Sequence, residues 1–341
     1  MLKLDSDYME GCHPNILEKL AEINFEKNAG YGTDGYSKSA KEKILKACGL
    51  ENGDVYFISG GTQANMTIIS SILKPYESVV AVESGHISTH EAGAIEATGH
   101  KVSTISGVDG KMEAKNLSKF LKDFNDDENN EHTVFPKLVY ISMPTEFGTI
   151  YSKRELEEIY NVCQKYNVYL MVDGARLGYG LVCDECDMDI SFLANSCDIF
   201  YIGGTKVGAL FGEAIVMKEK DFIPHFKTMI KQRGALLAKG WLLGLQFDVL
   251  FSDNLYFKIA ENAIDKAKKL KKIFIEKGYK LYINSPTNQI FVIIENEKIK
   301  KLRENVSFSF WEKYDGKSSI VRFVTSWATK DEEIEKLEKY L

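Results

Sequence analysis

Short runs of β-branched and aromatic residues alternate with helical patterns through about residue 220, and this alternation is the strongest constraint on the fold. It is typical of a parallel sheet with crossover helices. Several runs are apolar throughout, as expected of strands covered on both faces. We therefore predict an α/β fold with a mostly parallel central sheet and flanking helices. The predicted strands are Val55–Ser59, Val79–Val82, Val102–Ser106, Lys137–Ser142, Val168–Val172, Asp198–Ile202 and Glu213–Met217.

Two of the helical patterns between these strands are well marked. Ser37–Cys48 begins at Ser37, a favoured N-cap residue type, and is followed by a glycine, Gly49. Ser152–Tyr166 carries apolar residues at helical spacing. The acidic stretch Asp123–Glu131 is rich in turn-forming residues, so we expect a surface loop there.

The pattern changes after about residue 218 and stays helical as far as Gly278. Short strands and a charged helix are expected beyond it, at Gln289–Ile294, Ser307–Trp311, Ile320–Thr325 and Lys330–Tyr340. A chain of 341 residues has the length of about two domains. We expect a large domain over residues 1–240, with an N-terminal segment of residues 1–20, and a smaller C-terminal α/β domain over residues 241–341.

The charge balance narrows the classes of partner. With 43 basic and 49 acidic side chains the net charge is −6, which argues against nucleic acid or an anionic membrane surface. The N-terminus has no apolar segment, so no secretory signal is expected. No apolar run approaches the roughly 18 residues of a membrane span.

The six cysteines are scattered along the chain, which suits reduced thiols in the cytoplasm. The spacing of Cys183 and Cys186 could bind zinc or carry out redox chemistry. A zinc site needs further ligands, and no second pair with such spacing exists, so two unconnected thiols are favoured and no metal is expected.

Residues that directly follow strands deserve most weight, because ligands of open parallel sheets bind at the carboxyl ends of the strands. After the first predicted strand, Gly60, Gly61 and Thr62 precede a helical pattern, an arrangement that can hold a phosphate on backbone N–H groups. A tight strand–helix turn would have the same sequence. The loop has no lysine, so it is not a nucleoside-triphosphate loop.

Two further junctions carry charged residues. Asp173 follows the strand Val168–Val172 and precedes Arg176; this pair could be a capping acid and a surface base, or could bind a ring nitrogen and a substrate carboxylate. Lys206 lies in a glycine-rich segment after the strand Asp198–Ile202. Burial there would lower the pKa of its amine and suit it to Schiff-base formation, although the side chain could instead extend to solvent.

Together these junctions meet the needs of pyridoxal 5′-phosphate: a phosphate anchor, an acid partner for the pyridine nitrogen at Asp173 and an amine for the aldehyde at Lys206. His86, which follows the strand Val79–Val82, is placed to stack on the ring. A nucleotide-binding α/β protein remains an alternative, but it explains neither Asp173 nor Lys206.

At this point the sequence resembles the threonine aldolases, in the β-eliminating-lyase group of fold-type-I pyridoxal-phosphate-dependent enzymes, over nearly its whole length. Seven segments in the family's order carry the resemblance: Asp5-Ser6-Asp7, Tyr31-Gly32-Thr33-Asp34, Gly61–Asn65, Gly85-His86 with Glu91-Ala92-Gly93, Val172–Arg176, the Lys206 loop and Val321–Thr325. The resemblance implies cleavage of L-threonine or L-allo-threonine to glycine and acetaldehyde.

The resemblance also implies roles for single residues. Lys206 would be the Schiff-base lysine and Asp173 the partner of the pyridine nitrogen. The phosphate would be held by Gly60, Gly61 and Thr62, and His86 would stack on the ring. The substrate carboxylate would be bound by Ser6, Arg176 and Arg322. Tyr31 would reach the site, from a neighbouring subunit of a homodimer or homotetramer, and Arg233 or Lys239 would give the phosphate a further cation.

The sequence departs from the family pattern at two places. Glu146 stands where the family often has a histidine that meets the substrate's β-hydroxyl, and Thr205-Lys206-Val207 replaces Ser-Lys-Gly. The candidate bases for the β-hydroxyl are His86, which we favour, then Glu146, and Glu91 through a water. Because Glu146 replaces the family's histidine, two alternative reactions remain open: a β-elimination, or an aldolase reaction on another β-substituted amino acid. A non-catalytic cofactor-binding protein is the remaining alternative.

Overall fold

The computed structural model describes residues 1–341, and its largest element is a seven-stranded sheet of order β2-β8-β7-β6-β5-β3-β4. Strand β8 runs in the opposite direction to the other six strands. The mostly parallel sheet is therefore confirmed. Its strands are β2 (Asp54–Ile58), β3 (Glu77–Val82), β4 (Lys101–Ile105), β5 (Phe135–Ser142), β6 (Tyr169–Gly174), β7 (Ile199–Gly203) and β8 (Glu213–Met217).

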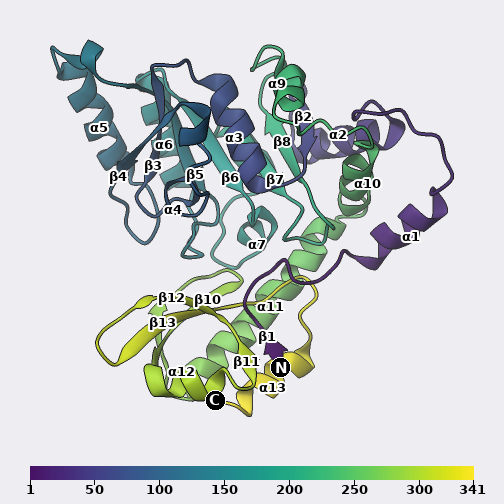
Figure 1. Ribbon diagram of the computed structural model, residues 1–341, viewed down its shortest axis with the longest axis vertical. Coiled ribbons are helices and arrows are strands. Elements are labelled where there is room, and N and C mark those ends of the chain that lie inside the picture. The colour runs from purple at the N-terminus through teal and green to yellow at the C-terminus, as the bar shows by residue number, and fades with distance from the viewer.

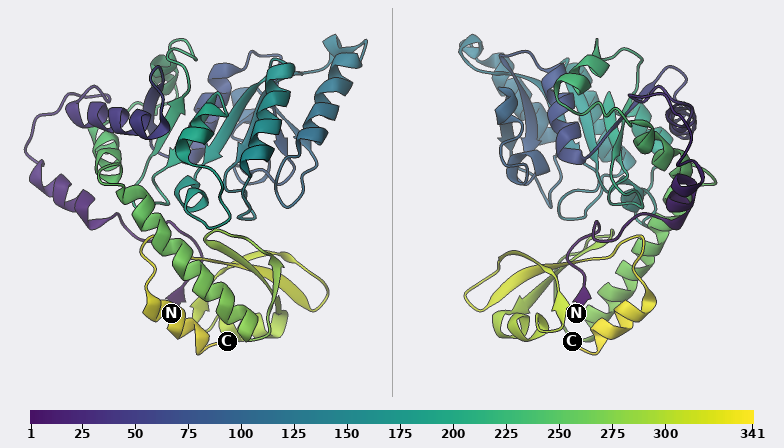
Figure 2. Two further views of the ribbon diagram at one scale, coloured as in Figure 1. Left: turned by 180° about the vertical axis from the view of Figure 1, so that it is seen from behind. Right: turned by 45° about the vertical axis from the view of Figure 1, so that its right-hand side comes forward.

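Helices cover both faces of this sheet, which explains why its strands are apolar throughout (Figures 1 and 2). In β6 the side chains of Leu170 and Val172 enter one core and that of Met171 enters the other. The Met171 face is covered by α3 (Gly61–Ile72) and α9 (Phe226–Gln232). Helices that pack on the opposite face include α2 (Gly35–Cys48), α5 (Ala114–Asp126), α6 (Lys153–Lys165), α8 (Ile190–Asn195) and α10 (Trp241–Leu250).

The predicted strands of the large sheet all form, with bounds within two residues of those expected. The predicted N-cap Ser37 is wrong. Helix α2 begins a turn earlier, because Asp34 accepts a hydrogen bond from the backbone N–H of Ser37, while Gly49 ends the helix as predicted, with a φ of 62°. The expected loop Asp123–Glu131 is also partly wrong, because α5 continues to Asp126 on the buried side chains of Leu117 and Leu121.

A smaller antiparallel sheet lies below the large one in the view of Figure 1, and its strand order is β12-β13-β10-β9. Helix α11 (Leu255–Glu276) extends from the large sheet's helices to this sheet, where Leu270 and Phe274 enter a third core. The other elements here are β9 (Lys280–Ile283), β10 (Gln289–Glu295), β11 (Val306–Ser307), β12 (Ser309–Lys313), β13 (Ser318–Val324), α12 (Asn296–Leu302) and α13 (Asp331–Glu338).

The first residues of the chain join this smaller sheet region. Strand β1 (Leu2–Lys3) pairs in parallel with β11, and Leu4 enters the same core as Phe274. The chain then returns to the large sheet through α1 (Pro14–Glu22). The remaining short helices are α4 (His86–Thr89) and α7 (Leu177–Leu181). No helix combines the length and the apolar character needed to cross a membrane.

Candidate active site

A cleft opens at the carboxyl ends of the parallel strands, and the loops after β2, β5, β6 and β7 all reach it. Its inner part is lined by Tyr8, Ser59, Gly60, Gly61, Thr62, His86, Ser142, Pro144, Thr145, Glu146, Asp173, Ala175, Arg176, Tyr201, Thr205, Lys206 and Glu213. Its outer part shares Tyr8, His86, Glu146, Arg176 and Lys206, and adds His90 together with Ser309, Phe310, Trp311 and Arg322 from the small sheet. The cleft therefore lies between the two sheets.

The loop after β2 forms an anion cradle at one end of the cleft. Gly60 is the N-cap of α3 and provides no side-chain cap, which leaves the first N–H groups of the helix available to a ligand. A Cβ atom at Gly61 would lie 3.1 Å from the Tyr201 hydroxyl, so glycine keeps this approach open. The loop therefore suits the phosphate of the predicted cofactor.

Asp173 lies at the end of β6 and is 4% exposed. Its carboxylate accepts hydrogen bonds from Tyr140, from Asn65 at 3.1 Å and from the backbone N–H of Ala175 at 3.0 Å. Burial acts to raise its pKa, but the charge of His86 and hydrogen bonds from Tyr140, Tyr201 and Ala175 outweigh burial and hold the pKa below its ordinary value. An ionised buried carboxylate suits a protonated pyridine nitrogen.

Lys206 follows β7, and its side chain lies in both parts of the cleft. Burial, together with the positive charge of Arg176, lowers the pKa of its amine. Near neutral pH a larger share of this amine is therefore uncharged than in an exposed lysine, which is the form that attacks a carbonyl.

Hydrogen bonds link the floor of the cleft from Asp173 to His86. Asn65 Nδ2 donates to Glu91 at 2.7 Å as well as to Asp173, and Glu91 Oε1 lies 2.8 Å from His86 Nδ1. Burial alone would lower the pKa of His86, but the hydrogen bond to Glu91 and the nearby carboxylates raise it. Because Nδ1 is held by Glu91, Nε2 is the ring nitrogen of His86 that is free to exchange a proton.

A second chain of hydrogen bonds runs from Asp173 to Glu146. Ser142 Oγ lies 3.3 Å from the Tyr140 hydroxyl and 2.7 Å from Glu146 Oε1, which also accepts the backbone N–H of His86 at 2.9 Å. Glu146 Oε2 is buried without a partner. Burial raises the pKa of Glu146. Glu146 therefore lies beside His86 and differs from Asp173 in the direction of its pKa shift.

Two arginines define the other side of the cleft. The guanidinium of Arg176 forms two hydrogen bonds with Asp7, at 2.7 and 3.0 Å, so this arginine is already paired. Arg322 donates to Gln289 at 2.9 Å, but its Nε is buried without a partner. Burial and the charge of Arg176 lower the pKa of Arg322 to about 10. An anion between the two guanidiniums would relieve both the missing hydrogen bond and the repulsion.

Most of the predicted site residues therefore meet in one cleft, but several do not line it. Glu91 does not line the cleft but is buried behind His86, with its Oε1 against Nδ1 of that ring. The Ser6 hydroxyl is buried without a partner, and its neighbours Asp7 and Tyr8 reach the cleft region instead. Arg233 and Lys239 are not among the lining residues.

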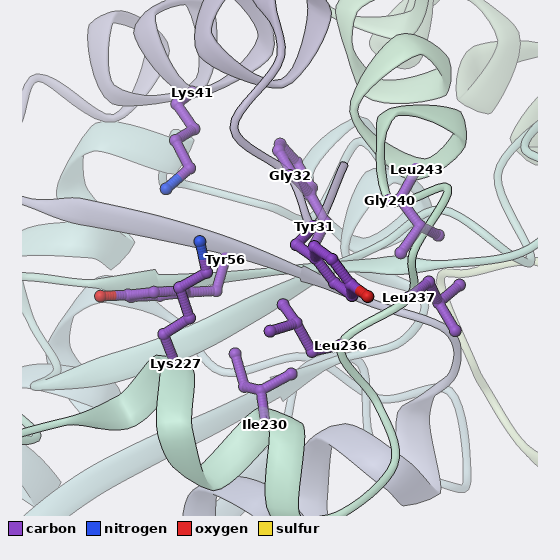
Figure 3. A pocket seen from close by; sticks show the side chains of 11 residues that line it. Tyr31, Gly32, Lys41, Tyr56, Lys227, Ile230, Leu236, Leu237, Gly240 and Leu243 are labelled. Carbon is purple, nitrogen blue, oxygen red and sulfur yellow. The ribbon is translucent and has the colours of Figure 1, made fainter. Parts of the chain in front are cut away.

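Tyr31 lies in a different pocket, which Figure 3 shows with Tyr56, Lys227 and Leu236 around it. Its side chain is 44% exposed, and Lys231 Nζ lies 4.7 Å from the ring centroid. Within one chain, Tyr31 therefore does not contribute to the cleft.

Sequence reasoning missed Ser142, Tyr201 and Glu213, which line the cleft, and Asp7, Asn65 and Tyr140, which bond to residues of its lining. Tyr140 and Ser142 are polar residues two positions apart at the buried end of strand β5, and this spacing is a signal that could have found them. Glu213 is the first residue of a buried strand and gives a similar one. Nothing in the sequence pairs Asp7 with Arg176, because 169 residues separate them.

Comparison with known proteins agrees with this geometry. The sequence profile of the family described as "Beta-eliminating lyase" matches residues 3–296. Low specificity L-threonine aldolases from Pseudomonas aeruginosa and from a Pseudomonas species are each 27% identical to this chain, over 97% of it and 94% of the relative.

Among solved structures, a threonine aldolase from Leishmania major is 42% identical and covers 99% of this chain and 98% of its own, with a TM-score of 0.96. An aspartate aminotransferase from Thermus thermophilus is similar in fold alone, with 15% identity, coverage of 100% and 90%, and a TM-score of 0.73. The predicted fold-type-I architecture and the resemblance to the threonine aldolases are thus confirmed.

Proposed function

The chain belongs to the beta-eliminating lyase family, and on that premise we propose that it is a pyridoxal-phosphate-dependent aldolase. Its reaction is cleavage of L-threonine or L-allo-threonine to glycine and acetaldehyde. This substrate class is supported by relatives that are named as threonine aldolases, one of which has a solved structure and is 42% identical to this chain.

The observation that carries the proposal is the meeting of Asp173, Lys206 and the Gly60–Thr62 cradle in one cleft. When bound, pyridoxal phosphate supplies a protonated pyridine ring that accepts the electron pair released as the bond between the α and β carbons breaks. Asp173 keeps the ring nitrogen protonated, because its carboxylate is ionised and buried. The amine of Lys206 would hold the cofactor through its aldehyde, and the N–H groups of the cradle would hold its phosphate.

Arg322 binds the α-carboxylate of the substrate in this proposal. Its Nε has no hydrogen-bond partner in the chain, and its guanidinium faces the charge of Arg176. A carboxylate held here fixes one substituent of the α carbon and so limits rotation about the bond that must break. Arg176 contributes mainly its positive charge, since Asp7 already takes two of its donors.

His86 takes the proton from the β-hydroxyl in this proposal, through Nε2. Its pairing with Glu91 orients the ring and increases its basicity, as carboxylate–histidine pairs do. Glu146 is the second candidate base, because it lies against the backbone of His86 and has a raised pKa. Glu91 acts through His86 and is a positioning residue.

The substrate assignment can be tested directly. The purified protein with pyridoxal phosphate is incubated separately with L-threonine, L-serine and L-cysteine, and acetaldehyde and pyruvate are assayed in each. Acetaldehyde from threonine supports the proposal. Pyruvate without acetaldehyde would instead support a β-elimination, the alternative that the unusual Glu146 favours.

The assembly and location of the protein are also proposals. A homodimer or homotetramer would bring Tyr31 of one chain to the cleft of another, and the exposure of Tyr31 in a separate pocket supports this proposal. The scattered free cysteines favour the cytoplasm. The division into two domains at residue 240 remains a prediction, and the packing of α10 on α2 favours a later boundary, within α11.

A further inference from the structure

One buried charged group in the cleft has no part in the proposed chemistry. Glu213 is 4% exposed, begins β8, and lies opposite Ile58 of β2 and Gly203 of β7 in the sheet. The phosphate cradle follows β2 and the Lys206 loop follows β7. Glu213 is thus placed between the two segments that would hold the cofactor's phosphate and aldehyde, and it lines the same cavity.

The hydrogen bonds of Glu213 all go to the loop that carries the lysine. Oε2 accepts the backbone N–H of Gly204 at 2.9 Å, and Oε1 accepts the hydroxyl of Thr205 at 2.8 Å. The same hydroxyl oxygen accepts the backbone N–H of Gly212 at 2.9 Å. Thr205 also lines the cavity, but with Glu213 ionised its only proton is directed to the carboxylate.

A phosphate in this cavity would meet a carboxylate with little positive charge to balance it. Of the three basic side chains in the lining, Arg176 is paired with Asp7 and His86 with Glu91, and the amine of Lys206 has a lowered pKa. Two negative groups in a buried site cannot both stay fully charged without a large cost, and one of them takes up a proton.

The groups that face Glu213 agree with this reasoning. Burial raises its pKa to about 7, the positive charge of Lys206 acts in the opposite direction, and Asp173 raises it further. The remaining titratable neighbours are the phenols of Tyr201 and Tyr256, both with pKa values raised by burial and therefore neutral. The segments from β2 and α3 contribute no charged side chain to the cavity. A bound cofactor would add its phosphate beside Glu213, while its protonated ring would be paired with Asp173.

We infer that Glu213 takes up a proton from solvent when the cofactor phosphate binds, and that this proton transfer turns the Thr205 hydroxyl from the carboxylate toward the phosphate. The protonated Oε1 then donates to Thr205 Oγ, which frees the hydroxyl proton for a phosphate oxygen. Glu213 would make cofactor binding weaken as the pH rises above neutrality. This inference rests on the proposed cofactor but not on the substrate.

The test uses 4-deoxypyridoxine 5′-phosphate, which has the ring and the phosphate but no aldehyde. Lys206 then stays a free amine in the wild type and in Glu213→Gln alike, so its contribution cancels when the two proteins are compared. Calorimetric titration in buffers of different protonation enthalpy measures the protons taken up on binding. At pH 7.5 we expect the wild-type protein to take up on the order of half a proton more than Glu213→Gln. The ratio of the wild-type affinity for the analogue to that of Glu213→Gln should fall by up to about tenfold for each pH unit above neutrality.

Glu213→Gln is a suitable variant because its amide can still accept from Gly204 and donate to Thr205 Oγ, as the protonated acid would. Glu83→Gln is the matched control: it removes the same charge from an exposed residue near the end of β3, and it should behave as the wild type does. Equal proton uptake and a constant affinity ratio between wild type and Glu213→Gln would overturn the inference and leave Glu213 a structural cap of the loop.

A second measurement does not depend on the variant folding. Infrared difference spectra of the wild-type protein at pH 8, with and without the analogue, should gain the band of a protonated carboxyl group. Spectra without such a band would contradict the inference while leaving the cofactor assignment intact. Failure of the wild type to bind the analogue at all would contradict both.

Discussion

The wall of the cleft that comes from the seven-stranded sheet differs from the wall that comes from the small sheet. On the first wall, Asp173 has donors from Asn65, Tyr140 and Ala175, and hydrogen bonds continue from it to His86 and Glu146. On the second, Arg322 has a buried Nε without a partner. The large sheet thus holds its groups in a hydrogen-bonded network and leaves only acceptor oxygens such as Glu146 Oε2 without partners, whereas the small sheet presents an unmet donor. We propose that the first wall serves the cofactor and that the second serves the substrate.

Asp173→Asn gives the sharpest test of the first wall. A neutral amide cannot keep the ring nitrogen protonated, so we expect the rate of acetaldehyde release to fall by about 10³-fold, the upper range for losing one aligned electrostatic group. The absorbance of the bound cofactor should remain, because the Gly60–Thr62 cradle and Lys206 are unchanged. A variant that loses its cofactor but keeps its rate when resupplied would assign Asp173 to retention only.

His86→Asn and Glu146→Gln, compared side by side, separate the two candidate bases on the first wall. We expect about 10²-fold loss of kcat for the histidine variant, the lower range for a general base, and a smaller loss for the glutamate variant. The rate should rise with pH as His86 becomes neutral, and this rise should persist in Glu146→Gln. If it disappears in Glu146→Gln and persists in His86→Asn, the roles are reversed.

Arg322→Gln tests the second wall. Loss of a charge-assisted contact to the substrate carboxylate should raise KM by roughly 10- to 100-fold. The cofactor absorbance should stay that of the wild type, since Arg322 lies on the substrate side. Arg303→Gln, which alters an exposed arginine of the same small sheet region, is the control. A weakened cofactor with an unchanged KM would remove the distinction between the two walls.

Glu91→Gln should produce the smallest effect, a shift of the pH profile. Glu91 raises the pKa of His86, so its loss lowers that pKa, and His86 becomes neutral and able to accept a proton at lower pH. The rising limb of kcat against pH should therefore move down by on the order of one unit. Glu96→Gln, at an exposed position nearby, should leave the limb in place. A limb that moves upward would contradict the pairing seen between Glu91 and His86.

The two walls also differ in how far the sequence predicts them. Asp173, Lys206 and Gly60–Thr62 were predictable because each directly follows a parallel strand, and such strand ends meet at one edge of the sheet. The pairing of Asp7 with Arg176 was not, since it depends on β1 pairing with β11, a contact between distant segments with no local signal.

Two smaller differences between prediction and structure, the start of α2 and the position of Tyr31, arise from the local course of the chain. Asp34 and Ser37 are both favoured N-cap residue types, and helix α2 begins after Asp34, whose side chain accepts the backbone N–H of Ser37. Tyr31 lies in the same motif segment as Asp34, but it lines a pocket outside the cleft. The chain turns at Tyr31, with a φ of 59°, and enters α2. Helix α2 packs on the opposite face of the sheet from α3, the helix that follows the phosphate cradle.

The most direct measurement of the central claim is reduction of the protein with borohydride in the presence of pyridoxal phosphate, followed by mass spectrometry of its peptides. The reduction makes any bond between the cofactor and an amine permanent. We predict one modified peptide, with the cofactor on Lys206. Modification of another lysine in place of Lys206, or none at all, would contradict the assignment of this cleft.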